Sequence, residues 1–123
     1  MRESRFWGLH MISAVVILVF LGLHMVLMHL DGTLALINPA WGKPLAWGHV
    51  LARARSDFFT VTYLLMLAAA LFHGLYGSRT MLYELIENQT VRKIISVSFL
   101  TGGIMLFGLG AYAIITMHLV ANP

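Results

Sequence analysis

Histidine is the residue type in this sequence with the widest chemical potential, because an imidazole can ligate a metal or carry a proton. The chain has 123 residues and six histidines. Five of the histidines lie in or at the edge of long apolar segments: His10, His24, His29, His73 and His118. A polar side chain is costly in hydrocarbon unless it has a partner, so each is a candidate functional residue. The alternative is a hydrogen bond to another helix or to lipid headgroups, which we favour for His29, His49 and His118.

His73 lies in the segment with the clearest chemical pattern. On a helix, Gly77 is four residues beyond His73 and lies on the same face, where it lets a macrocycle or another helix approach the backbone. Arg79 follows about 9 Å nearer to the water boundary, at the level where a haem propionate or a quinone oxygen could accept its hydrogen bonds. These three residues predict a haem site. They also fit a packing face of small residues whose arginine extends to the headgroups.

Depth in the membrane separates the other candidates. His24 follows His10 by 14 residues, which is roughly 21 Å of helix, and lies close to the same face. His73 lies roughly 20 Å from the start of its own segment. These depths put His24 and His73 in opposite leaflets, so we expect that they cannot ligate one iron but could each ligate one of two haems. His10 and His73 lie at closer depths and could meet within the chain.

Three apolar segments must position these side chains, at about 7–30, 58–78 and 94–119. Each is long enough for a membrane-spanning helix, which needs about 20 residues. The composition agrees, because 59% hydrophobic and 11% charged residues leave too few charges to cover a soluble domain. We predict an all-α integral membrane bundle of three transmembrane helices that forms a single domain over residues 1–123. Gly103 and Gly110 share a face of the third segment, which predicts close packing against a partner subunit or within the chain.

The charge and the cysteine count exclude several functions. Without cysteine the chain has no thiolate zinc site, no cysteine-held iron–sulfur cluster and no thioether-linked haem. A net charge of +3 with scattered Lys and Arg does not indicate a nucleic-acid partner. The positive-inside rule predicts a cytoplasmic N-terminus. On that side lie Arg2, Arg5, Arg79, Arg92 and Lys93, and on the other lie Lys43, Arg53 and Arg55.

The pattern His-x-x-x-Gly-x-Arg followed by an acidic residue resembles the haem-ligand helix in membrane anchors of the succinate dehydrogenase and fumarate reductase family. Over most of its length the chain looks like the hydrophobic membrane anchor, or D, subunit of bacterial succinate dehydrogenases. The similar segments are Ala54 to Phe59, Phe72 to Gly74, Gly108 to Ala113, and the His24 to His29 spacing. The Ser-x-x-His-Arg motif of the companion C subunit is absent, because Met11 follows His10.

The resemblance implies that His73 supplies one axial ligand to a haem b near the cytoplasmic face and that a second anchor (cytochrome b) subunit supplies the other. In dihaem members a first-span histidine holds a second haem, and His24 is the matching position. Arg79 would face the haem propionates or quinone, and His10 is a further candidate contact. Tyr83 is the candidate quinone ligand, although the order Tyr83-Glu84 reverses the Asp-Tyr order common in that subunit.

The implied assembly is respiratory complex II in the cytoplasmic (inner) membrane of a bacterium. A flavoprotein and an iron–sulfur subunit would pass electrons from succinate, an intermediate of the tricarboxylic acid cycle, to quinone, so this chain would not be catalytic alone. The alternative is a purely structural anchor of a redox complex, with no haem or quinone ligand of its own. An unrelated transporter subunit would need polar stripes through every span, and the second and third spans have none apart from His73.

Overall fold

The computed structural model describes residues 2–39, 43 and 45–123, and the described part is built from helices. Three long helices dominate it: α1 (Arg2–His29), α4 (Asp57–Leu85) and α5 (Gln89–Ala121). Two short helices, α2 (Asp31–Ile37) and α3 (Trp47–Arg55), lie between α1 and α4. The three long helices are each long and apolar enough to cross a membrane. The predicted all-α, three-helix fold is confirmed.

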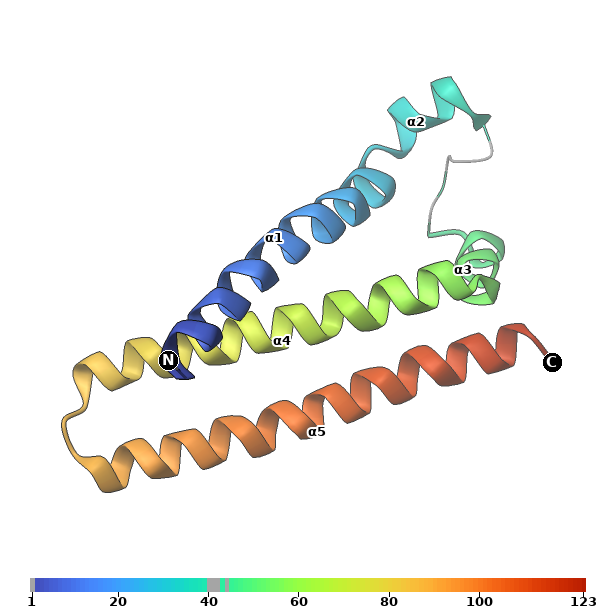
Figure 1. Cartoon of the computed structure of the whole chain (residues 1–123). Helices are drawn as coiled ribbons and strands as arrows, with labels where there is room; N and C mark the ends of the chain where they lie inside the picture. Colours follow the sequence, from blue (N-terminus) through green and yellow to red (C-terminus); the bar gives the residue numbers. More distant parts are fainter. Residues whose placement is uncertain (1, 40–42, 44) are drawn as a thin grey trace.

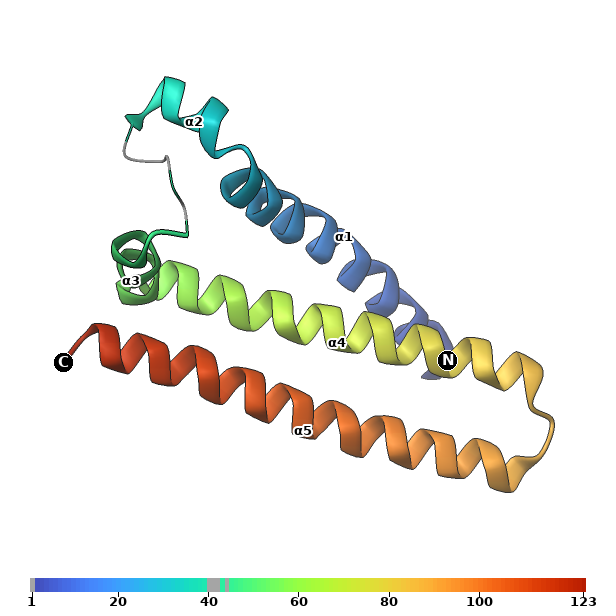
Figure 2. The same cartoon turned by 180° about the vertical axis from the view of Figure 1, so that it is seen from behind.

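The long helix α4 is the centre of the arrangement, with α1 packed on one side and α5 on the other (Figure 1). α4 and α5 form an antiparallel hairpin through residues 86–88, and α3 packs against both helices at the opposite end (Figure 2). We call these the hairpin end and the α3 end. The N-terminus of α1 lies beside the later part of α4, and α2 lies farther from the α4–α5 pair (Figures 1 and 2).

The helices extend beyond the predicted segments, most of all at the hairpin end. From hydropathy alone, the second span ends at residue 78 and the third begins at residue 94, because polar residues interrupt the apolar run there. Polar residues do not end a helix when their groups are satisfied, and Thr80 donates its hydroxyl proton to the Tyr76 carbonyl. At the start of α5 the Asn88 side chain accepts from the backbone N–H groups of Thr90 and Val91, so this cap sets the boundary.

Close packing between α4 and α5 depends on two glycines of α5. A Cβ atom at Gly103 would lie 2.7 Å from Cδ1 of Leu75, and one at Gly110 would lie 2.6 Å from Cδ2 of Leu67. Each glycine therefore accommodates a leucine of α4 at close range. Of the two alternatives that the sequence left open for these glycines, the structure shows packing within the chain.

Little of the molecule is buried. Among the described side chains, only Ser13 and Ala121 are buried, whereas large apolar residues such as Leu18 and Leu100 are mostly exposed. In water such a surface would be strongly unfavourable. Exposed apolar faces on three long helices are consistent with contact to a lipid bilayer.

Candidate functional site

The imidazoles of His10 and His73 meet between α1 and α4. Their ring centroids are 4.1 Å apart and their planes differ by 4°, so the rings are stacked face to face. The meeting of these two histidines agrees with the depths expected from the sequence. The stacking also limits their chemistry, because the lone pair of an imidazole nitrogen lies in the ring plane. Parallel planes at this distance cannot direct two nitrogens at one iron between them, so this pair does not form a bis-histidine ligand set.

Hydrogen bonds fix the orientation and the tautomer of His73. Nδ1 of His73 lies 3.3 Å from the carbonyl oxygen of His10 and 3.3 Å from Oγ of Ser13. The Ser13 hydroxyl donates to the same His10 carbonyl at 2.7 Å. A carbonyl only accepts, so all three contacts are hydrogen bonds when Nδ1 of His73 carries the proton and donates to this pair. The neutral ring then carries its lone pair on Nε2.

The residues around His73 fit an axial haem ligand. A ligating histidine usually donates its other N–H to a carbonyl or another acceptor, which fixes the ring and raises its basicity. His73 has this arrangement through Nδ1, and its Nε2 has no hydrogen-bond partner among the described residues. A haem needs only one ligand on each face, so the fit does not depend on a larger cluster. No group of three or more potential ligands from His, Cys, Asp and Glu occurs in the described part of the chain.

Gly77 lies on the face of α4 that meets α1. A Cβ atom at this position would lie 3.3 Å from Cε1 of His10, so the glycine makes room for the imidazole of α1. The sequence predicted that Gly77 would let a macrocycle or another helix approach the backbone. Within this chain the approaching group is a helix side chain.

Two residues to which the sequence assigned no functional role complete the surroundings of the pair. Ser13 is three residues after His10, and Tyr76 is three residues after His73, so each shares a helix face with its histidine. Tyr76 is tilted against His10 at 5.2 Å and stacks on Phe72 at 5.5 Å, measured between ring centroids. The sequence signal that could have identified them is the polar or aromatic residue three positions after each histidine.

His24 lies elsewhere along α1 and contacts the ring edge of Tyr63 at 5.9 Å between centroids. Tyr63 and His73 are ten residues apart on α4, or about 15 Å of helix. The structure therefore brings His10 and His73 together and keeps His24 apart from them.

Arg79 and Tyr83 form a second group nearer the hairpin end. The Tyr83 hydroxyl donates to the Arg92 carbonyl at 2.8 Å and lies 2.5 Å from the Ser96 hydroxyl. The guanidinium carbon of Arg79 lies 4.8 Å from the centre of the Tyr83 ring, and that of Arg92 lies 5.3 Å from it. The hydroxyl of Tyr83 thus already has partners within the chain. Arg79 is six residues beyond His73, which places it roughly 120° away around α4.

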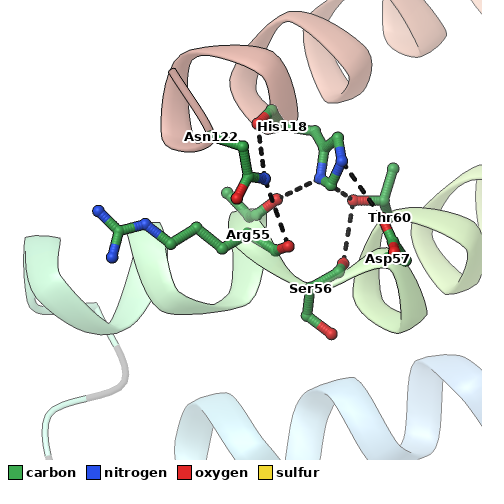
Figure 3. Close-up of polar contacts among 7 residues, drawn as sticks. Arg55, Ser56, Asp57, Thr60, His118 and Asn122 are labelled. Carbon is green, nitrogen blue, oxygen red and sulfur yellow. Dashed lines mark hydrogen bonds and ion pairs between the residues drawn. The ribbon is translucent and has the colours of Figure 1, made fainter.

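At the α3 end, His118 connects the helices α3, α4 and α5 through its imidazole (Figure 3). Its Nδ1 donates to the Ala54 carbonyl at 2.6 Å and lies 3.1 Å from the Thr60 hydroxyl, while Nε2 faces an Asp57 carboxylate oxygen at 3.3 Å. Arg55 donates through Nε to the Ala121 carbonyl at 2.8 Å. These contacts tie α3 to the first turn of α4 and the last turns of α5. The group supports a structural role for His118.

No protein family, curated protein or solved structure matches this chain.

Proposed function

We propose that this chain is a membrane anchor subunit of a succinate:quinone oxidoreductase, and that His73 is one axial ligand of a haem b shared with a second anchor subunit. In this assignment the chain belongs to respiratory complex II and is not catalytic alone. Its partners are a cytochrome b subunit, an iron–sulfur subunit, a flavoprotein subunit and quinone. A bound haem b would accept and donate single electrons.

The orientation of His73 is the observation that carries the proposal. Its Nδ1 proton is directed at the His10 carbonyl and at Ser13, which leaves the Nε2 lone pair for a metal. Ser13 is buried, so this contact is shielded from solvent. A histidine with a fixed tautomer and a free Nε2 is suited to axial ligation.

A second haem ligand would have to come from outside this chain. His10 is the nearest imidazole to His73, and its stacked ring cannot ligate the same iron. A second anchor subunit with a histidine at the same depth would supply the missing ligand. Ligation of the haem by two imidazoles would favour electron transfer over oxygen chemistry.

For quinone we propose a site at the hairpin end, shared with the partner subunits. Arg79 and Tyr83 are the residues of this chain that the resemblance connects with it. The Tyr83 hydroxyl is engaged with Arg92 and Ser96, so its direct contribution would require a change of partner. We therefore expect most direct contacts to the quinone to come from the other subunits.

We place the protein in the cytoplasmic (inner) membrane of a bacterium with the N-terminus in the cytoplasm. The hairpin end would then be cytoplasmic, where the flavoprotein and iron–sulfur subunits dock. The excess of basic residues at the N-terminus and between α4 and α5 supports this orientation.

The decisive experiment is purification of the chain together with the products of its neighbouring reading frames. We expect a flavoprotein and a cysteine-rich iron–sulfur protein among them, succinate–quinone reductase activity, and a b-type band in the reduced-minus-oxidised spectrum. Activity without that band would assign the chain to the purely structural anchors. Absence of both the activity and the redox partners would refute the family assignment.

The structural anchor is the second candidate, and one observation favours it. The contacts of His73 to the His10 carbonyl and Ser13 would also satisfy a histidine that only links α1 to α4. The two candidate functions differ in the role of Nε2 of His73. It ligates haem in the haem-binding anchor and has no function in the purely structural anchor. The spectrum of the purified complex separates them.

A further inference from the structure

A groove runs between α4 and α5 on the hairpin side of the molecule. It has a cavity volume of about 530 Å³ and a mainly apolar lining. Phe72, Leu100 and Phe107 contribute to its walls, and Arg79 and Ser96 provide polar groups toward the hairpin end. Neither His10 nor His73 lines this groove, so it is separate from the proposed haem ligand.

The dimensions of the groove match one leaflet of a bilayer. Ala68 and Arg79 line its two ends on α4 and are eleven positions apart, which is about 16 Å of helix. Half of a hydrocarbon core is about 15 Å. A chain of methylene groups extending from the level of Arg79 toward the middle of the bilayer would therefore follow the apolar walls along their length.

The charge at the hairpin end of the groove identifies the kind of headgroup. Nε of Arg79 is shielded from solvent and has no hydrogen-bond partner among the described residues. No described carboxylate forms an ion pair with Arg79 or Arg92, and both guanidinium groups lie over the Tyr83 ring. A guanidinium at the groove beside a second positive charge favours an anionic partner, and a phosphate oxygen can accept hydrogen bonds from a guanidinium. A quinone head is neutral, so a quinone bound at the hairpin end would leave this positive charge available to an anionic group.

We propose that the α4–α5 groove is a binding site for an anionic phospholipid. Its phosphate group pairs with the guanidinium of Arg79, and one acyl chain lies along the groove toward Ala68. The site joins two helices that already pack through Gly103, so a bound lipid would cover the surface they leave open. The proposal does not depend on the haem assignment.

The test is native mass spectrometry of the full-length chain in detergent, titrated separately with phosphatidylglycerol and phosphatidylcholine. We expect at least a tenfold preference for phosphatidylglycerol. Arg79→Gln should remove the preference, whereas Arg5→Gln, which deletes the same charge from exposed α1, should keep it. Equal binding of the two lipids, or a preference that survives Arg79→Gln, would refute the proposal.

Two further measurements make the assignment specific to the groove. Ala68→Trp adds bulk at the mid-bilayer end while leaving Arg79 in place, and should weaken phosphatidylglycerol binding about tenfold. Undiminished binding by this variant would place the lipid elsewhere. In a competition arm, decylubiquinone at a concentration equal to the lipid should not displace phosphatidylglycerol. Displacement that requires Arg79 would assign the groove to quinone and overturn the proposal.

Discussion

Nδ1 of His73 lies 3.3 Å from the hydroxyl oxygen of Ser13, which itself donates to the His10 carbonyl. This relationship connects α1 and α4 in the middle of the proposed site. It leaves Nε2 of His73 as the basic nitrogen of the ring. The function of the site then depends on what Nε2 meets in the assembled complex.

Replacement of His73 is the direct test of ligation. His73→Ala should remove the haem b at the hairpin side while α1, α4 and α5 remain inserted, since insertion depends on the apolar length of these helices. The measurement is haem content per purified complex by the pyridine haemochrome assay. His29→Ala is the matched control, because His29 is exposed at the end of α1 and should keep the full haem content. Unchanged haem in the His73 variant would exclude this residue as a ligand.

Ser13→Ala tests the hydrogen bond that fixes the His73 tautomer. The His10 carbonyl still accepts from Nδ1, so we expect haem to remain bound but to be lost about tenfold faster, as for other residues that orient a metal ligand. Haem transfer from the complex to an excess of apomyoglobin measures this rate. Ser98→Ala, on an exposed position of α5, provides the control. Equal transfer rates for the two variants would show that Ser13 does not support the ligand.

His24 is the candidate ligand of a second haem. In a complex with two haems, His24→Ala should remove the one near the α3 end and spare the one at His73. The contact with Tyr63 places His24 too far along the bundle to affect both. A potentiometric titration followed in the b-type band should lose one of its two steps. A preparation with only one haem per complex, or loss of both haems in the variant, would contradict a ligand role for His24.

The features that depend on hydrophobicity and helical spacing were predictable from the sequence. Helix boundaries set by caps and the rotation of side chains around a helix were less so. Apolar length predicted three spans, and the depths along the helices allowed His10, but not His24, to meet His73. The boundaries at Thr80 and Asn88 depend on individual hydrogen bonds, which hydropathy does not detect. The direction of Arg79 depends on its angle around α4. Its level along the helix was predictable, but its position in the lining of the α4–α5 groove was not, because this position depends on how α5 packs on α4.

His118 shows the same limit at the α3 end. The sequence placed it near the membrane surface, but its partners depend on the extended backbone of Ser56 between α3 and α4.

His118→Ala should destabilise the docking of α3 by about 1 kcal/mol, because the Ala54 carbonyl loses its donor. Trypsin cleavage after Arg55 in the detergent-solubilised protein should accelerate. Asp57→Asn should have little effect, since the Asp57 side chain is 94% exposed and an exposed ion pair contributes little. Equal acceleration by both variants would assign the docking to the ion pair instead.

Gly103 provides the test of packing within the chain. Gly103→Val should displace the Leu75 side chain of α4, because even a Cβ atom would lie 2.7 Å from its Cδ1. We expect a loss of about 1–3 kcal/mol, the usual cost of overpacking, measured by thermal unfolding of the purified chain in detergent. Gly102→Val carries the same change in helix propensity, yet a Cβ at Gly102 meets no atom within 4 Å, so its unfolding temperature should stay close to that of the original protein.

Leu75→Ala in the Gly103→Val background should recover part of the loss, since the two side chains would compete for one space. Equal destabilisation by the two valine variants would mean that backbone propensity, rather than the contact with Leu75, explains the glycine.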